Sequence, residues 1–396
     1  MIRCLEVIYL DHSATTPVCH AARRAVLEAF DSFGNPSSLH SEGLKAQKLL
    51  DESRKALFGA LNIRNTQAYR VIFTSCGSEA NNQIIFSAAA SRLSRRTDGA
   101  PYRIVTTDSE HPSVEMALKE LEKNGADVVR LSTVKGVIDQ NELENAVDER
   151  TVLVTIMGVN NETGAVYDTR ALFAAAKRKN PGVVTHSDCV QAFMKIPFSM
   201  PASSADAVTL SAHKIGAPKG CGALVVTEKL SRAFLRPFIH GGGQEGGLRS
   251  GTENVPGIAA FGAAAAERFS SAGKEALHAL SLREALLSAL PSEIRVNSPE
   301  NVCPGIVSLT LPDIKSETML HFLSSKGVFV SSGSACSSNG HKNRAEKSRV
   351  LLNFGLTERE ADCTIRLSTG PDNTEEEMLF TAEALKEGLS TLVRIR

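Results

Sequence analysis

The sequence predicts an α/β protein in which strands alternate with helices along most of the chain. Between residues 71 and 226, short apolar runs rich in Val and Ile alternate with longer helical segments. Such alternation is typical of βαβ units, which build a mixed, mostly parallel sheet with helices on both faces. After residue 265 the pattern becomes helical and then restarts with strand-like segments, which predicts a smaller α+β domain. We expect a large domain over 16–264 and a small domain formed by 1–15 and 265–396.

The expected elements follow from local patterns in chain order. Strands are expected where short β-branched runs end in turn-forming residues, and helices where apolar residues recur at helical spacing or follow a first-turn proline. A short strand begins at residue 8, and further strands are predicted over 71–74, 104–107, 128–131, 152–157, 183–186, 207–211 and 222–226. Helices are predicted over 19–30, 41–61, from 79 onward, and over 112–124, 142–148 and 170–179. In the small domain, strands over 305–311 and 328–331 flank a helix over 316–325.

Charge balance and composition narrow the possible function classes. The 396 residues carry 44 basic and 44 acidic side chains, so the formal net charge is zero and no nucleic-acid or broad membrane-surface role is expected. The longest apolar run, 258–266, is far shorter than the ~20 residues that span a bilayer. The first seven residues lack the apolar core of a signal peptide. We expect a soluble, cytoplasmic protein.

Eight cysteines are scattered along the chain without CxxC pairs or histidine neighbours at zinc spacing. We therefore expect reduced thiols, with neither a disulfide framework nor a metal site. Cys221, Cys303 and Cys363 fit small buried hydrophobic residues. Cys336 lies in a run of Gly, Ser and Ala that cannot form a core, so its thiol is expected to be mobile and accessible.

Polar residues follow the predicted strands, at the positions where ligands bind in parallel α/β sheets. After strand 71–74, a turn of small residues opens into a helix at Gly77 and Ser78. Free backbone N–H groups, a hydroxyl and the helix dipole suit a phosphate there, although simple N-capping by Ser78 explains the same turn. After strand 104–107, His111 can stack on a planar ring and move protons, or it can only cap the next helix.

The next three strand ends carry further candidates. After strand 152–157, the second of two asparagines, Asn161, can donate to a carboxylate or phenolic oxygen, or form an Asx turn. After strand 183–186, Asp188 can pair with a protonated ring nitrogen or cap a helix. After strand 207–211, desolvation of Lys214 lowers its pKa and suits a nucleophilic amine, although a surface lysine beside a turn shows the same pattern.

A Gly-rich segment over 240–254 carries charged and amide side chains and is more typical of an anion-contacting loop, reaching a neighbouring subunit, than of a linker. Each of these features has an ordinary structural explanation when taken alone. Together they place a phosphate cradle, a ring-stacking His, a ring-nitrogen Asp and a Schiff-base Lys at successive strand ends. Those are the groups that a protein supplies to pyridoxal 5′-phosphate (PLP), so the sequence predicts a PLP site.

Over nearly its whole length the chain resembles the cysteine desulfurases, within the fold type I PLP-dependent enzymes. The motifs that carry the resemblance are Tyr9-Leu10-Asp11-His12-Ser13-Ala14-Thr15-Thr16, Gly34-Asn35-Pro36-Ser37-Ser38, Ser78-Glu79-Ala80-Asn81-Asn82, Glu110-His111, Val159-Asn160-Asn161-Glu162, Ser211-Ala212-His213-Lys214, Arg249-Ser250-Gly251-Thr252 and Ser331-Ser332-Gly333-Ser334-Ala335-Cys336. The last motif is typical of the housekeeping and nitrogen-fixation class of this family.

The resemblance implies a role for each matching residue around the cofactor. Those expected at the phosphate are Gly77, Ser78, Ser211, His213 and, from the partner subunit of a homodimer, Thr252. His111 would stack on the ring, Asp188 would pair with the pyridine nitrogen, and Gln191 would hydrogen-bond the phenolic oxygen. Lys214 would form the Schiff base with PLP.

The resemblance also implies the reaction. Sulfur would be removed from L-cysteine to give L-alanine and a persulfide on Cys336, for iron–sulfur cluster or other thio-cofactor assembly. Arg366 and Asn161 would bind the substrate carboxylate, and Asn161 would also contact the cofactor. Lys214 would move the Cα proton, and His111 would move protons to or from the thiols. The expected protein partner is an iron–sulfur scaffold or another sulfur acceptor.

Some residues depart from the family pattern. Cys76 and Ala217 stand where glycine is usual, and Cys189 stands where alanine is common. The basic segment over 337–347 is longer than is typical, which leaves the sulfur acceptor open. Two other interpretations remain at this stage. One is a selenocysteine lyase or a cysteine β-lyase that forms no persulfide; the other is a non-catalytic scaffold that docks sulfur-transfer partners.

Overall fold

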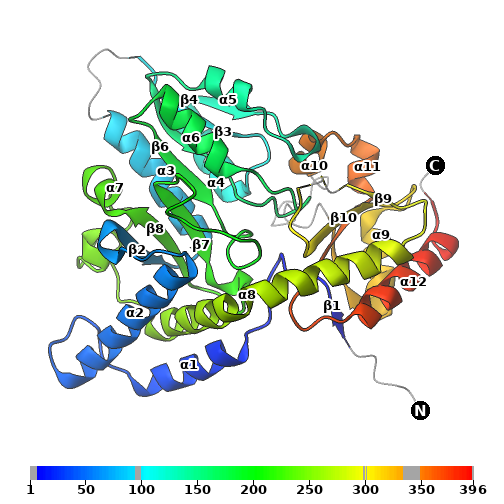
Figure 1. The fold of residues 1–396 in the computed structure, drawn as a ribbon, viewed down its shortest axis with the longest axis horizontal. Helices are drawn as coiled ribbons and strands as arrows, with labels where there is room; N and C mark the ends of the chain where they lie inside the picture. The colour runs from blue at the N-terminus through cyan, green and yellow to red at the C-terminus, as the bar shows by residue number, and fades with distance from the viewer. Residues whose placement is uncertain (1–6, 94–99, 298, 300, 333–347, 395–396) are drawn as a thin grey trace.

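The computed structural model describes residues 7–93, 100–297, 299, 301–332 and 348–394, and a seven-stranded sheet forms its largest part (Figure 1). In sheet order the strands are β2 Tyr69–Thr74, β8 Gly222–Thr227, β7 Ala207–Ser211, β6 Val184–Asp188, β5 Thr151–Thr155, β3 Arg103–Thr107 and β4 Asp127–Leu131. β8 is antiparallel to β2 and β7, whereas the other neighbours are parallel. Every strand of this sheet except β8 therefore ends at the same edge.

Helices cover both faces of this sheet, so the large part of the molecule has three layers (Figure 1). One face packs on α3 Gly77–Leu93, α4 Pro112–Lys123 and α7 Glu228–Ala233. The other face packs on α2 Ser41–Ala60, α5 Gln140–Ala146, α6 Thr169–Lys179 and the first half of α8 Val255–Ala289, with α1 His20–Asp31 against α8. The apolar side chains of both faces are removed from water, which stabilises the fold.

A smaller four-stranded sheet has the order β12 Ser331–Ser332, β13 Thr364–Ser368, β10 Ile306–Thr310 and β9 Arg295–Val296. Its core includes Leu309, Ile365 and side chains of α9 Ser316–Ser325 and α12 Glu375–Thr391. The N-terminal strand β1 Ile8–Tyr9 pairs in parallel with β11 Val328–Phe329, and its neighbour Leu10 enters the same core. The remaining short helices are α10 Arg349–Phe354, α11 Glu358–Asp362, and the 3₁₀ helices η1 Thr66–Ala68, η2 Val134–Gly136, η3 Ala212–Lys214 and η4 Glu245–Gly247.

Helix α8 joins the two parts of the molecule. Its 35 residues extend for about 52 Å at 1.5 Å per residue. Phe261 in its first half packs into the core of the large sheet, whereas Leu282 and Leu286 pack into the core of the small sheet. The boundary expected at residue 265 therefore falls inside a continuous helix, and the division into two domains stays a prediction.

The prediction of a single strand over 328–331 is wrong in one respect. The segment forms two strands, because residues 328 and 329 pair with β1 whereas Ser331 and Ser332 pair with β13. The chain passes from one sheet to the other at the buried Val330.

No helix in the part of the chain that the structure describes is long and apolar enough to cross a membrane.

Candidate active site

A cavity of about 330 Å³ opens at the edge where the strands of the large sheet end. It brings together ten of the twelve predicted site residues. They are Gly77, Ser78, His111, Asn161, Asp188, Gln191, Ser211, His213, Lys214 and Arg366. Arg366 comes from β13 of the small sheet, whereas the others follow or end strands of the large sheet. The cavity therefore lies where the two sheets meet.

The two remaining predicted residues are not in this cavity. Thr252 is exposed in the Gly-rich loop before α8 and does not line the cavity. Its expected role at the phosphate of a partner subunit stays a prediction. Cys336 and the basic segment that follows it lie outside the described residues.

Lys214 ends the 3₁₀ helix η3, directly after the buried strand β7. Its ε-amine donates to the carbonyl oxygens of Ser13, at 2.6 Å, and Ala14, at 2.7 Å. Thr16 donates to the Lys214 carbonyl at 3.2 Å, so the N-terminal loop holds this lysine at two places. The loop that follows β1 thus positions the amine at the edge of the large sheet where its parallel strands end.

Asp188 ends β6 and is 5% exposed. One carboxylate oxygen accepts from the Val190 backbone N–H at 3.0 Å, and the other accepts from Asn81 Nδ2 at 2.8 Å. These contacts fix the carboxylate on the cavity wall. Sequence reasoning missed Asn81 as a site residue, although its position three residues after Ser78 places both on one face of α3.

His111 caps α4, and its Nδ1 accepts from the Ser113 backbone N–H at 3.1 Å. Burial is the main cause that lowers the pKa of His111, the charge of Lys214 lowers it further, and Asp188 opposes both. The ring is therefore neutral at neutral pH, and its remaining proton lies on Nε2 because Nδ1 is an acceptor. Asn81 also donates to the Ser113 hydroxyl, at 2.9 Å, and so links the supports of His111 and Asp188.

The opposite end of the cavity is suited to an anion. Gly77 begins the 17-residue helix α3, whose first-turn N–H groups lie beside Ser78 and the buried Ser211. A Cβ at Gly77 would lie 2.9 Å from a Val190 methyl group, so the close approach of these two loops requires glycine. Burial, and then the charge of Lys214, lowers the pKa of His213 to about 4, which leaves a neutral ring that can donate a hydrogen bond.

Arg366 forms the cationic wall of the cavity and is 5% exposed. Its Nη1 donates to the Asn161 carbonyl at 3.0 Å, and its Nη2 contacts Asp11 Oδ1 at 2.6 Å. Its Nε is buried and has no hydrogen-bond partner within the described ranges. A guanidinium held in this way is suited to bind a carboxylate. Asp11 is a contact that the sequence did not single out.

Gln191 connects the cavity to a buried lysine. Its Nε2 donates to the Ser13 carbonyl at 2.9 Å, and its Oε1 accepts from Lys195 Nζ at 2.5 Å. Burial lowers the pKa of Lys195 to about 7. Sequence reasoning missed this residue, and the available signal was a lysine among the otherwise apolar residues 192–198.

Comparison with known proteins identifies the family. Residues 8–379 match the model of the class-V aminotransferases. The chain is 37% identical over 379 residues to cysteine desulfurase 2 of Trichormus variabilis, covering 94% of this chain and 91% of the relative. It is 36% identical over 385 residues to cysteine desulfurase IscS of Rickettsia rickettsii, covering 96% and 90%. A solved NifS-like protein superposes with a TM-score of 0.87 at 33% identity, covering 98% of this chain and all of the other.

The chain belongs to the cysteine desulfurase family. This membership confirms the predicted family, the fold type I α/β architecture and the expectation of a PLP-dependent cysteine desulfurase. It does not favour the selenocysteine lyase, β-lyase or scaffold interpretations.

The cavity has the size and chemical groups that PLP requires of this family. Its volume is in the range of small-molecule sites. The first turn of α3 and the hydroxyls of Ser78 and Ser211 can donate to a phosphate, and the Asp188 carboxylate can accept from a protonated ring nitrogen. Lys214 offers the primary amine. The residues present therefore fit the cofactor of this enzyme family.

The departures from the family pattern leave this cavity open. Ala217 and Cys189 are buried, with 1% and 0% exposure, and burial raises the pKa of the Cys189 thiol to about 12. Cys76 is partly exposed and lines the cavity beside Gly77. Burial also raises the thiol pKa of Cys221, to about 12, and of Cys363, to about 11, so these thiols are poor nucleophiles at neutral pH.

Proposed function

We propose that this protein removes sulfur from L-cysteine to give L-alanine, with the sulfur carried as a persulfide on Cys336. The observation that best supports this activity is the meeting of Lys214, Asp188 and Arg366 in one cavity, because it joins a primary amine, an anchored carboxylate and a carboxylate-binding cation. The reaction balances, since L-cysteine and a thiol yield L-alanine and a persulfide without an external oxidant.

In this proposal, Lys214 would hold PLP through its ε-amine, and Asp188 would keep the pyridine nitrogen protonated. His111 would stack on the ring, and Gln191 would donate to the phenolic oxygen. The residues expected to hold the phosphate are Gly77, Ser78, Ser211, His213 and the partner subunit's Thr252. When bound, PLP stores the electron pair that is left when a proton departs from the substrate's Cα.

The side chains of the chain supply the other steps. Arg366, together with Asn161, binds the carboxylate of L-cysteine and so presents its Cα to Lys214, which removes the Cα proton. The Asn161 side chain would also contact the cofactor. In this proposal His111 moves protons to or from the thiols, and the Nε2–H of its neutral ring can donate to a thiolate sulfur.

Sulfur transfer requires Cys336 as a thiolate. Its sulfur attacks the sulfur of the substrate, so that an S–S bond forms and the Cβ–S bond breaks. The bonding electrons remain with the carbon skeleton, which takes up protons to become alanine. A scaffold for iron–sulfur assembly, or another acceptor protein, then removes the terminal sulfur.

We further propose a cytoplasmic homodimer. The six cysteines in the described ranges are free thiols, in keeping with a reducing compartment. Several apolar side chains are exposed on α1, on α2 and between them, including Phe33 at 80% and Leu39 at 93%. Such a patch supports an interface with a second subunit.

The activity is tested by measuring alanine and sulfide formed from L-cysteine in the presence of a thiol reductant. Cys336→Ser is expected to keep the colour of bound PLP and lose sulfide release, since its hydroxyl cannot carry a persulfide. Cys19→Ser, at a half-buried thiol away from the cavity, is the matched control. Full turnover by Cys336→Ser would show that this cysteine does not carry the sulfur.

A further inference from the structure

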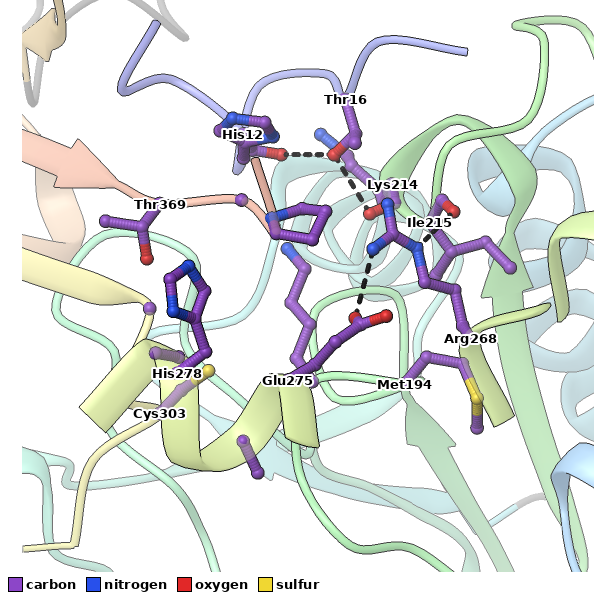
Figure 2. A pocket seen from close by; sticks show the side chains of 16 residues that line it. His12, Thr16, Met194, Lys214, Ile215, Arg268, Glu275, His278, Cys303 and Thr369 are labelled. Carbon is purple, nitrogen blue, oxygen red and sulfur yellow. Dashed lines mark hydrogen bonds and ion pairs between the residues drawn. The ribbon is translucent and has the colours of Figure 1, made fainter. Parts of the chain in front are cut away.

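Lys195 is a partly buried lysine whose hydrogen-bond partner belongs to the larger cavity. Its Nζ lies 2.5 Å from Gln191 Oε1, and Gln191 lines the cavity that also holds Lys214. Lys195 itself faces a separate, smaller cavity of about 70 Å³, which lies between α8 and the loops that follow β1, β6 and β13 (Figure 2). Any effect of Lys195 on a ligand of the larger cavity therefore passes through Gln191.

An ion pair does not account for this lysine. Glu275 is the carboxylate of the smaller cavity, and its Oε2 lies 3.0 Å from Arg268 Nη1 (Figure 2). Within the described ranges, no carboxylate pairs with Lys195, and its side chain contacts Gln191 instead. Burial of an amine costs solvation free energy that an apolar side chain would avoid. The hydrogen bond to Gln191 is thus what a lysine provides here and an apolar residue would not.

The two contacts of the Gln191 amide fix the direction in which it points. Lys195 donates to Oε1, whereas the Ser13 backbone carbonyl accepts from Nε2 at 2.9 Å. A rotated amide would place Nε2 against another N–H donor and Oε1 against a carbonyl oxygen, and it would lose both hydrogen bonds. Nε2 carries two hydrogens, so the hydrogen that Ser13 does not accept can be donated into the larger cavity.

This orientation does not depend on the charge of Lys195. Burial is the main cause that lowers the pKa of Lys195 to about 7, so its ammonium and amine forms coexist at neutral pH. Each form carries at least two N–H hydrogens and can donate to Gln191 Oε1. The Ser13 carbonyl selects the same orientation of the amide in both forms.

The backbone between the two residues has an uncommon conformation. Gln191 and Lys195 belong to one turn of helical character, in which the Phe193 N–H donates to the Cys189 carbonyl at 2.8 Å. Met194, directly before Lys195, has a φ of 61°. This left-handed conformation is unfavourable for a residue with a Cβ, and it persists where the surrounding contacts require it. The placement of Lys195 is therefore specified by its surroundings.

We propose that Lys195 is a positioning residue for the larger cavity, where it holds the Gln191 amide so that a hydrogen of Nε2 is presented to an oxygen of the bound ligand. The identity of that oxygen, the phenolic oxygen of PLP, rests on the proposed function. The Ser13 carbonyl accepts from Gln191 and also from Lys214, at 2.6 Å, so this donor lies beside the amine that would hold the cofactor. Without Lys195, Oε1 loses its donor and can turn toward the ligand, where it repels an oxygen.

A cofactor analogue without the phenolic oxygen separates this role from a general effect on the fold. The full-length apoenzyme is titrated with PLP and with 3-deoxypyridoxal 5′-phosphate, and absorbance reports binding. Lys195→Met and Lys195→Leu should each lower the preference for PLP over the analogue about tenfold, the effect of one hydrogen bond to a charged oxygen. Lys195→Arg keeps a donor, with the smaller cavity as room for its larger side chain, and should keep the preference.

Lys179→Met, at an exposed lysine on α6, is the matched control and should also keep the preference. Gln191→Met should lower it, and adding Lys195→Met to Gln191→Met should have no further effect, because the amide through which Lys195 acts is gone. A thermal melt confirms that each variant is folded.

The proposal is overturned if Lys195→Met and Lys195→Leu show the same preference as Lys179→Met, or if Lys195→Met lowers the preference equally with and without the Gln191 amide. A loss of preference in Gln191→Met alone would remove the role of Lys195 and keep the proposed contact of Gln191. An unchanged preference in Gln191→Met would remove that contact itself, and the role of Lys195 with it.

Discussion

Substitution of Arg366 by lysine tests how the cavity recognises a carboxylate. The guanidinium is almost fully buried and is held by the Asn161 carbonyl at 3.0 Å and by Asp11 at 2.6 Å, which leaves Nε without a partner in the described part of the chain. Lysine keeps the charge but has a single nitrogen, so it cannot keep both supports and also offer a two-pronged contact to the substrate.

The expected magnitude follows from the lost contacts. A hydrogen bond to a charged group contributes about 1.5–3 kcal/mol, and about 1.4 kcal/mol corresponds to a factor of ten. Loss of one such bond to the substrate carboxylate should raise the KM for L-cysteine about 10- to 100-fold, with a smaller change in kcat.

Steady-state alanine formation at varied L-cysteine concentration measures this effect. Arg359→Lys, at an arginine of α11 that pairs with Asp313 at the surface, is the matched control. A thermal melt of both variants separates loss of recognition from loss of folding. Equal kcat/KM values for Arg366→Lys and Arg359→Lys would refute the role of Arg366 in substrate binding.

Three further substitutions test the account. Asn81→Ala removes the side-chain donor to Asp188 and should weaken PLP affinity about tenfold, measured by absorbance titration, whereas Asn82→Ala should not; equal affinities would contradict the support role. Gly77→Ala puts a Cβ 2.9 Å from Val190 and should also weaken PLP binding, whereas Gly59→Ala, with open space at that position in α2, should not; unchanged affinity of Gly77→Ala would show that the close approach is not needed. Buried His186 has a pKa of about 3, against about 6.5 when unfolded, so the unfolded chain binds the extra proton and stability falls as the pH drops through 6.5. Between pH 7 and pH 5 this residue should cost about 2 kcal/mol in urea unfolding, and His186→Gln should show a smaller pH difference than the unsubstituted protein; an equal difference would contradict the assignment.

Much of the large sheet could be predicted because its strands are short, buried and bounded by turns. The central strands β5, β6 and β7 are buried at every position, so their apolar runs stand out in the sequence. The direction of β8 could not be predicted, because an apolar run has the same pattern in a parallel and in an antiparallel pair. The split between β11 and β12 was missed for a similar reason, since their partner strands β1 and β13 are far away in sequence.

Among the residues of the candidate site, some could be predicted from local sequence and others could not. Lys214 and Asp188 could be found because each follows a predicted strand, and ligands bind where parallel strands end. Arg366 became a candidate only through the family resemblance, because it reaches the cavity from the other sheet. Asn81 and Lys195 act through hydrogen bonds to Asp188 and Gln191, and such partners depend on side-chain geometry that the local sequence does not specify.

The most direct test of the account is to find where PLP is attached. Borohydride reduction of the purified holoenzyme fixes the cofactor to its lysine, and peptide mass spectrometry then locates that residue. Lys214 donates to the Ser13 carbonyl, and Lys195 is linked to the same carbonyl through Gln191, so the measurement must discriminate between two lysines. The account predicts attachment at Lys214. Attachment at Lys195, or no attached cofactor, would contradict it.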